Sequence, residues 1–397
     1  MEVDGIAAVA GSDRIDSLAA SLPTNLILVL NSGSSSLKFG LYYRGGSDTD
    51  EQPLLTGSAE GIGHSTGALR IQSGDGKSLL QRQQVHESQS DALTALAHAI
   101  REHIQSSPVA VGHRVVHGGP KLRRHQQITP AVLEELHSAT HFAPLHIPQA
   151  LSLIKSAQSM FPSAAQFACF DDAFHQTMPE VASRFAIPSR YFEAGIFRYG
   201  FHGISYESLV HHFGDKLPAR AIFAHLGNGS SLCALRHGKS IDTTMGLTPT
   251  GGIPMGTRSG DLDPGVILYL MRNEKLNGDQ LEEMLNRRSG LFALSSGQSD
   301  VKLLEERTRA NDHDATLALD VLAISIRKSI GAYIALLGGV DLLVFTGGIG
   351  EHSEPIRTAA THGLEPLGLT ADKIQVVPTQ EERQIARHCR VLMTQGT

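Results

Sequence analysis

Two arginines, a histidine and an aspartate in this chain adjoin strand-like or glycine-rich segments, where side chains can reach a bound anion. Arg114 lies within a β-rich run, and Arg258 lies in a run that contains two glycines. Asp171 directly follows an apolar segment, and His202 stands between a phenylalanine and a glycine. A planar guanidinium binds a carboxylate or a phosphate through two parallel hydrogen bonds. These residue types indicate chemistry on anions, although each one alone is also compatible with a structural ion pair or a core histidine.

Three strand-like segments end in turns of small residues, at Asn31, Gly227 and Gly347. Glycines let backbone N–H groups face an anion without intervening side chains, and serine hydroxyls add further donors. In open α/β sheets, ligands bind beyond the carboxyl ends of the strands. A single turn of this kind also serves as an ordinary tight turn. Three together favour a polyphosphate ligand.

Better-known phosphate and hydrolase motifs do not fit this sequence. Residues 76–78 and 238–240 spell the end of a Walker A loop, but neither has the required glycine five residues earlier. Residues 348–350 follow a strand-like segment, but Ser353 replaces the third glycine of a dinucleotide-binding fingerprint. The GxSxG spelling at residues 63–67 follows no apolar strand, which a nucleophile elbow requires.

The segments that must position these residues repeat at half the length of the chain. Residues 26–30 form a short aliphatic run that ends in a Gly/Ser turn, and residues 37–43 have the pattern of a returning strand. Residues 221–226 and 232–235 repeat this arrangement around a second Gly/Ser turn. Such hairpins are common, but two of them about half a chain apart indicate a duplicated domain.

Strand-like and helix-like segments alternate through the rest of the chain. The strand-like segments are 109–116, 165–170 and 342–345. The helix-like segments are 129–138, 148–159 and 314–337. This alternation predicts an α/β architecture.

The composition excludes several classes of protein. The 397 residues exceed one ordinary core, and 41% hydrophobic with 19% charged residues is typical of a soluble globular protein. A net charge of −6 argues against nucleic acid or an anionic membrane as partner. The absence of Trp and an aromatic content of 5% argue against base-stacking platforms.

The cysteines and the N-terminus indicate a cytoplasmic protein. The three cysteines, Cys169, Cys233 and Cys389, form neither a disulfide framework nor a CxxC metal site. No apolar run approaches the roughly 18 residues of a membrane span. Residues 1–24 carry acidic residues where a signal peptide is basic, so we interpret them as an extension in front of the fold.

These segments together resemble the acetate kinase family, within the acetate and sugar kinase/Hsp70/actin fold group. The matching strings are LVLNSGSSSLKFG, GHRVVHGG, FAPLHIP, FDDAFHQTMP, RYGFHG, HLGNGSSL, MGLTP, MGTRSGDLDPG, VFTGGIGE and PTQEE. The resemblance implies an α/β fold of two duplicated actin/Hsp70-like (ribonuclease H-like) domains with an interdomain cleft. The implied domains are 25–170 plus 384–397, and 171–383, the latter carrying the nucleotide site and a homodimer interface.

The resemblance also implies an ATP:acetate phosphotransferase that reversibly forms acetyl phosphate and ADP with Mg²⁺, or with Mn²⁺. The implied catalytic residues are Asp171, His202 and Arg258. The implied substrate-binding residues are Arg114, Val116, Leu145, His146, Phe201 and Pro249. The implied nucleotide-binding residues are Lys38, His225, Leu226, Gly227, Asn228, Gly229, Asp300, Val301, Lys302, Gly347, Gly348, Ile349, Gly350 and Glu351. The implied metal residues are Asn31 and Glu381.

The sequence departs from the family pattern at a few of these positions. Val301 and Lys302 stand where relatives often carry Cys-Arg, which bears on nucleotide preference. Asp172 stands where the family often has Thr, and Gln380 replaces the usual Asn.

The expected chemistry needs no general base, because a carboxylate is already nucleophilic at pH 7. The harder problem is to bring two anions together, so we expect Arg114 and Arg258 to offset their charge and His202 to donate to an equatorial oxygen. Asp171 is expected to orient an arginine or the water shell of the metal. Three alternatives stay open: a propionate or butyrate kinase, a non-enzymatic ATP-binding protein of the same fold group, and a dehydrogenase built on residues 348–350.

Overall fold

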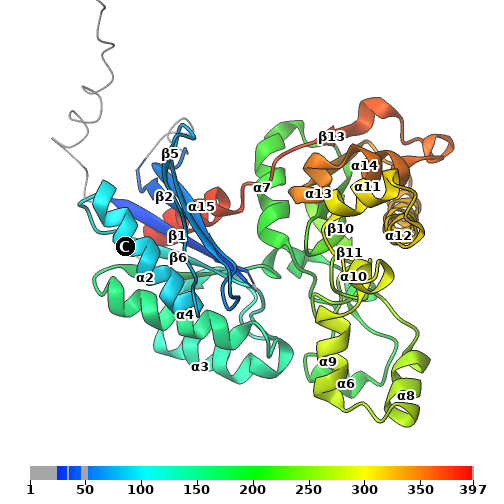
Figure 1. Cartoon of the computed structure of the whole chain (residues 1–397), viewed down its shortest axis with the longest axis horizontal. Coiled ribbons are helices and arrows are strands. Elements are labelled where there is room, and N and C mark those ends of the chain that lie inside the picture. The colour runs from blue at the N-terminus through cyan, green and yellow to red at the C-terminus, as the bar shows by residue number, and fades with distance from the viewer. Residues whose placement is uncertain (1–24, 34, 46–51, 396–397) are drawn as a thin grey trace, which may run out of the picture. The chain divides into compact units, whose positions relative to one another are not determined.

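The computed structural model describes residues 25–33, 35–45 and 52–395 (Figure 1). The described residues form two compact units: those within 25–113, 152–167 and 389–395 form the first, and residues 114–151 and 168–388 form the second. Residues 114–151 thus fall in the second unit, whereas the sequence placed them in the N-terminal domain. The domain boundaries expected from the sequence, 25–170 plus 384–397 and 171–383, stay a prediction. The predicted extension, residues 1–24, lies outside the described residues.

A mixed β-sheet forms the centre of the first unit. Its strands stand in the order β5-β4-β3-β2-β1-β6-β8. Their bounds are β1 (Leu26–Ser32), β2 (Ser36–Tyr43), β3 (Leu55–Glu60), β4 (Ala68–Ser73), β5 (Ser78–Gln83), β6 (Ala110–Val115) and β8 (Ala165–Phe170). β1 pairs antiparallel with β2 and parallel with β6. Helices α2 (Gln89–His103) and α4 (Ile147–Met160) pack apolar side chains against the aliphatic run of β1, which is why that run is buried.

The second unit is built on a five-stranded sheet in the order β11-β10-β9-β12-β13. Its strands are β9 (Arg220–Leu226), β10 (Ser230–Arg236), β11 (Lys239–Thr243), β12 (Leu342–Thr346) and β13 (Ile374–Val376). Helix α12 (His313–Leu337) packs against this sheet in one apolar cluster, and helix α7 (Gly203–Phe213) packs against it in another. Asp312 caps α12 by accepting from the N–H of Ala315, and Gly338 ends it with φ of 72°. The predicted long helix is confirmed.

The two sheets repeat one pattern of strands. In the first sheet the order β3-β2-β1-β6-β8 contains an antiparallel hairpin beside a parallel strand. In the second sheet the order β11-β10-β9-β12-β13 contains the same hairpin and the same parallel neighbour. The two hairpins are those that the sequence repeat identified. The α/β fold class is confirmed.

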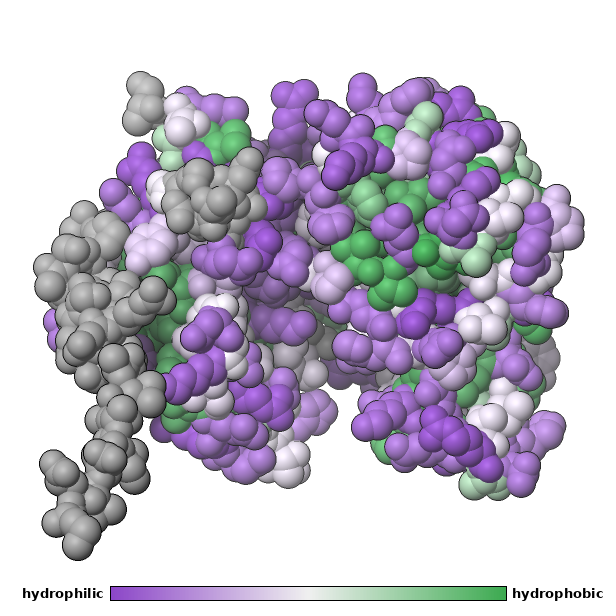
Figure 2. Space-filling model, turned by 90° about the horizontal axis from the view of Figure 1, so that it is seen from above, coloured by the Kyte–Doolittle hydropathy of each residue, from purple (hydrophilic) through white to green (hydrophobic). Residues whose placement is uncertain are grey.

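The remaining elements in the described part of the chain are mostly short helices. They are α3 (Pro130–Ser138), α5 (Glu180–Ser183), α6 (Ser189–Glu193), α8 (Pro264–Asn273), α9 (Gly278–Arg287), α10 (Gly290–Leu294), α11 (Val301–Arg309), α13 (Gly347–His352), α14 (Glu354–Thr361), α15 (Glu381–Gln395), five 3-10 turns and the two-residue strand β7 (Gln126–Gln127). None of the described helices combines the length and apolar character that a membrane span requires. On the face in Figure 2, hydrophilic side chains separate the apolar patches.

One segment of the predicted site differs in form from its prediction. The sequence after β12 predicts a turn of small residues, but residues 347–352 form helix α13. Gly347 makes the entry possible because its φ of 77° lies in the left-handed region that favours glycine. The carboxylate of Glu351 then accepts a hydrogen bond from the N–H of Gly347 at 2.9 Å and stabilises the first turn.

Candidate active site

Arg114 and Asp171 form a buried ion pair at the ends of β6 and β8. The N–H of Asp171 donates to the carbonyl of Val115 at 2.9 Å, which fixes the aspartate beside the end of β6. Nη2 of Arg114 then donates to Oδ2 of Asp171 at 2.5 Å. The side chain of Asp171 is 1% exposed and that of Arg114 is 15% exposed. The pair therefore holds the guanidinium in a fixed orientation.

Burial and charge act in opposite directions on this pair. Burial raises the pKa of Asp171, and the positive charge of Arg114 offsets only part of that rise. Burial alone would lower the pKa of Arg114, but attraction to Asp171 and Glu381 outweighs it and raises the pKa. Arg114 therefore stays positively charged while it is buried.

His202 is held in an unusual backbone conformation at the start of α7. Its φ of 60° lies in the left-handed region, which non-glycine residues adopt rarely and often at functional sites. Nδ1 of His202 lies 2.9 Å from Oγ of Ser231, and the hydroxyl of Tyr206 lies 2.6 Å from the same oxygen. Burial lowers the pKa of His202 well below its usual value, and the charges of His225, Arg114 and Arg258 lower it further. His202 is therefore a neutral imidazole at pH 7.

Gly229 lies beside a ring nitrogen of His202 and a guanidinium nitrogen of Arg258. A Cβ atom at this position would lie 3.1 Å from Nε2 of His202 and 3.3 Å from Nη1 of Arg258. Nη1 of Arg258 also donates to the carbonyl of Pro249 at 3.2 Å. Burial lowers the pKa of Arg258, and repulsion from Arg114 lowers it further. The structure thus brings both arginines, His202 and a glycine turn into one region of the second unit.

The segments 225–229 and 347–351 meet at the carboxyl ends of two parallel strands, because His225 in β9 stands opposite Thr346 in β12. A Cβ atom at Gly347 would lie 3.2 Å from Nε2 of His225, and one at Gly227 would lie 3.9 Å from the amide nitrogen of Gly348. The ring of His225 stacks on that of His202 at 4.2 Å. The two glycine-rich segments therefore lie next to each other, and the stacked histidines connect them to the region that contains the arginines.

The third predicted nucleotide segment, residues 300–302, adjoins the first through Gly256. A Cβ atom at Gly256 would lie 3.6 Å from Cβ of Ser299 and 3.8 Å from the carbonyl oxygen of Asn228. Asp300 caps α11 by accepting from the N–H of Leu303 at 3.0 Å. The side chain of Lys302 is exposed.

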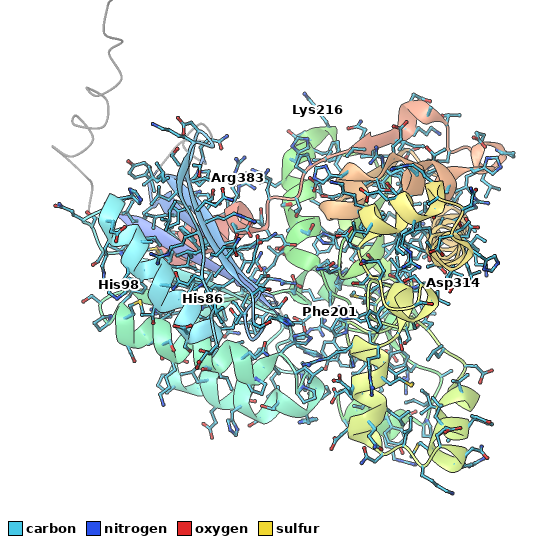
Figure 3. All side chains as sticks on the ribbon, viewed as in Figure 1. His86, His98, Phe201, Lys216, Asp314 and Arg383 are labelled. Atoms are coloured by element: carbon cyan, nitrogen blue, oxygen red, sulfur yellow. The ribbon has the colours of Figure 1, made fainter. Side chains whose placement is uncertain are left out.

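The predicted apolar pocket includes residues that pack together. Val116 and Phe201 lie in one cluster with Tyr199, Met245 and Met255 (Figure 3 labels Phe201). Pro249 is buried, and Leu145 and His146 are half-buried. Burial lowers the pKa of His146 to about 4, and the charges of Arg258 and Arg114 add to this effect. His146 is therefore a neutral residue in the field of both arginines.

The two predicted metal residues belong to different units. Glu381, the first residue of α15, is 9% exposed, and its charge acts on Arg114, Asp171 and His225 in the second unit. Asn31 is buried in β1 of the first unit, where it stands opposite the exposed Lys38 in the hairpin. Within the described part of the chain, Oδ1 of Asp171 is buried without a hydrogen-bond partner. The unsatisfied oxygen of Asp171 and the carboxylate of Glu381, both in the second unit, are hard oxygen donors of the kind that Mg²⁺ prefers.

Sequence reasoning missed the residues that orient the two histidines. Ser231 and Tyr206 fix His202, while Ser205 lies 2.8 Å from Nδ1 of His225 and 2.9 Å from Oγ1 of Thr379. Ser231 stands beside a predicted nucleotide segment, which is a weak sequence signal. Tyr206 and Ser205 have no such signal because they lie inside a helix.

Comparisons with known proteins identify the family of this chain. The acetokinase family model matches residues 26–392. Acetate kinase of Nitrobacter hamburgensis is 40% identical over 395 residues, covering 92% of this chain and 96% of its own length. The crystal structure of Porphyromonas gingivalis acetate kinase has a TM-score of 0.81 and 34% identity, covering 93% of this chain and 100% of the other. A propionate kinase from Francisella tularensis subsp. tularensis SCHU S4 has a TM-score of 0.83 and 35% identity, covering 92% and 98%. This chain belongs to the acetokinase family.

Proposed function

We propose that the chain transfers the γ-phosphoryl group of ATP to acetate in a reversible, Mg²⁺-dependent reaction. An oxygen of the acetate carboxylate forms a bond to the γ-phosphorus, and the bond from that phosphorus to the β–γ bridging oxygen breaks. The products are acetyl phosphate and ADP, which leaves with the negative charge on its β-phosphate. The observation that carries this proposal is the pair of buried guanidinium groups, Arg114 and Arg258, beside the glycine-rich ends of β9 and β12.

Each arginine has a separate task in this proposal. Arg114 binds the acetate carboxylate, because its ion pair with Asp171 fixes the direction of the guanidinium. Arg258 and His202, which both lie beside Gly229, stabilise the transferring phosphoryl group. Asp171 acts by positioning Arg114, since a carboxylate nucleophile has no proton to lose at pH 7.

In this proposal the nucleotide lies against three segments, two of which are rich in glycine. Residues 225–229 and 347–351 present backbone N–H groups, and residues 300–302 and Lys38 complete the nucleotide site. Asn31 and Glu381 would hold Mg²⁺, which neutralises phosphate charge when bound. Mn²⁺, which takes the same oxygen ligands, is the second metal that this donor set fits.

We also propose that the protein is a cytoplasmic homodimer that joins through its second unit. Helix α8 has an apolar sequence, yet none of its residues is buried within one chain. Val266, Leu268, Tyr269 and Met271 are between 41% and 59% exposed. An exposed apolar helix of this kind is characteristic of a surface that another subunit covers.

A propionate kinase is the second candidate, because a structure of that description matches this chain as well as the acetate kinase structures do. Both activities share the arginines and differ only in the room around the substrate methyl group, where Val116 and Phe201 pack. One added methylene in an apolar pocket changes binding by roughly 1–3 kcal/mol.

The test is to trap the acyl phosphate with hydroxylamine, using ATP, Mg²⁺ and acetate, propionate or butyrate in turn. We expect acetate to have the highest kcat/KM. A higher value with propionate would move the assignment to the second candidate. ATP binding without an acid-dependent product would leave only a non-enzymatic ATP-binding protein.

A further inference from the structure

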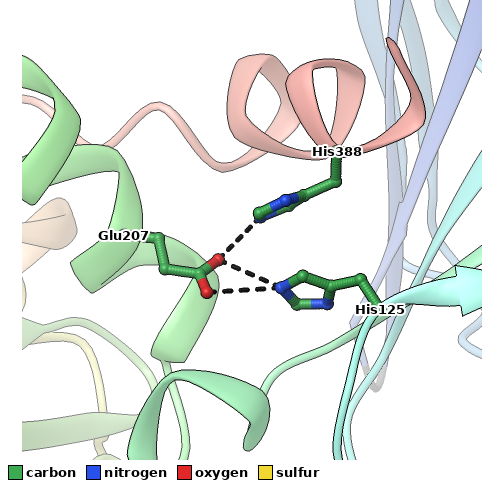
Figure 4. Close-up of side chains that lie close together, drawn as sticks. All are labelled: His125, Glu207 and His388. Carbon is green, nitrogen blue, oxygen red and sulfur yellow. Dashed lines mark hydrogen bonds and ion pairs between the residues drawn. The ribbon is translucent and has the colours of Figure 1, made fainter. Parts of the chain in front are cut away.

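Three titratable side chains gather in the second unit without a part in the proposed reaction (Figure 4). His125 directly precedes β7, Glu207 lies on α7 and His388 lies on α15. Nε2 of His125 is 3.3 Å from both carboxylate oxygens of Glu207, and Nε2 of His388 is 2.7 Å from Oε2. The side chains are between 13% and 19% exposed, so solvent reaches the group.

We propose that His125, Glu207 and His388 bind a divalent transition-metal ion, with Zn²⁺ as the best fit. Each residue offers one ligand atom, and these three atoms all lie within 4.8 Å of one another. Two imidazoles and one carboxylate, with a fourth position open to water, are a ligand set that zinc takes up in proteins.

The separations between the carboxylate and the two imidazoles lie near those of a tetrahedral site. Ligand atoms at about 2.0–2.1 Å from zinc stand about 3.3–3.4 Å apart along a tetrahedral edge. The separation of 3.3 Å between His125 Nε2 and the Glu207 oxygens matches this edge. The shorter separation at His388 requires only a small outward movement of an imidazole that is partly exposed.

The chemistry of the ligands separates this site from the magnesium site of the proposed reaction. Mg²⁺ and Ca²⁺ prefer oxygen ligands, whereas imidazole nitrogen favours zinc and its transition-metal neighbours. Asn31 and Glu381 offer oxygen only, and His125 and His388 offer nitrogen. An excess of Mg²⁺ therefore leaves the histidine site available to zinc.

Metal binding requires one adjustment at His125. Its Nδ1 accepts a hydrogen bond from the N–H of Phe170 at 3.0 Å, so the neutral ring carries its proton on Nε2. Zinc at Nε2 shifts that proton to Nδ1, where it faces the N–H of Phe170, so the imidazole must turn away and this N–H loses its acceptor. The exchange is favourable because zinc coordination far exceeds one hydrogen bond in free energy. Phe170 directly precedes Asp171, so the metal acts on the segment that carries the ion pair with Arg114.

The test titrates the full-length, chelator-treated chain with Zn²⁺ by calorimetry in the presence of excess Mg²⁺. We expect one zinc ion per chain and binding at least tenfold weaker in each of His125→Asn, Glu207→Gln and His388→Gln. The first variant keeps an acceptor for the Phe170 N–H, because the asparagine oxygen takes the place of Nδ1. Circular dichroism without metal establishes which variants are folded. The zinc affinity of any folded variant is then compared with that of the wild type.

The matched control is the double variant His211→Ala/His212→Ala, which removes two exposed histidines from the same helix as Glu207. We expect it to bind zinc as the wild type does. The proposal is overturned if wild type binds zinc no more tightly than the three cluster variants, or if the control loses binding instead. The titration needs neither ATP nor acetate, so its failure leaves the proposed phosphoryl transfer untouched.

Discussion

Gly229 is the position where the smallest change reaches both donors that are proposed to stabilise the transferring phosphoryl group. An alanine Cβ would lie 3.1 Å from Nε2 of His202 and 3.3 Å from Nη1 of Arg258. Non-bonded heavy atoms are at their optimum about 3.5–4.0 Å apart. Gly229→Ala therefore displaces both donors by a few tenths of an ångström. The backbone accepts the change, since the φ of Gly229 lies outside the left-handed region.

The magnitude follows from the role of the two donors. Removing a single hydrogen-bond donor to a developing negative charge costs ~2.7–4 kcal/mol, which is about 10²–10³-fold in kcat. Displacing two donors at once should cost a similar amount, so we expect kcat to fall about 10²-fold. The free energy of unfolding should change little, because no buried side chain is lost. Hydroxylamine trapping of the acyl phosphate measures the first quantity, and urea unfolding measures the second.

Gly331→Ala is the matched control for this change. Gly331 lies inside α12, and a Cβ atom there would meet nothing within 4 Å. We expect unchanged kcat and a gain of roughly 0.5–1 kcal/mol in the free energy of unfolding, because alanine is the better helix residue. The reasoning is refuted if Gly229→Ala keeps the kcat of the wild type, or if its activity falls only because the protein unfolds.

Two further predictions concern pH and assembly. Burial lowers the pKa of His175 to about 4, so its neutral form stabilises the fold fully above pH ~6.5, and this stability falls as the pH drops toward 4. Between pH 7 and 5, the free energy of unfolding of the wild type, measured with urea, should fall by about 2 kcal/mol because of this group. The fall should be smaller in His175→Gln by the same amount. An equal fall in both proteins would show that His175 is not the cause. Tyr269→Glu places a charge on the exposed face of α8. Light scattering should therefore detect a monomer for this variant and a dimer for the wild type. A variant dimer as stable as that of the wild type would exclude this face as the interface.

The repeated sheets could be predicted because their signal is local. An aliphatic strand, a Gly/Ser turn and a second strand determine a hairpin without reference to the rest of the chain, and both hairpins formed as expected. The long helix was equally predictable, because its apolar positions recur at spacings of three and four and Gly338 ends it. Helix α13 was missed because glycines at 347, 348 and 350 have the composition of a turn. A tertiary contact stabilises this helix, because the carboxylate of Glu351 accepts hydrogen bonds from the backbone N–H groups of both Gly347 and Thr379.

The arrangement of the candidate site could be predicted only in part. The arginines were singled out from their surroundings and from a family resemblance, but their mutual repulsion appears only in three dimensions. The ion pair joins Arg114 in β6 to Asp171, the residue that follows β8, and no sequence pattern encodes such a pair. The left-handed conformation of His202 is likewise hard to predict, because only a few per cent of non-glycine residues adopt it.

The account depends on two buried guanidinium groups that offset the repulsion between a nucleotide and an acid in one site. The most direct measurement is kcat for acyl phosphate formation by Arg258→Ala, with urea unfolding as the control for its fold. The account predicts a fall of about 10²–10³-fold with an unchanged unfolding midpoint. A kcat near that of the wild type would contradict it.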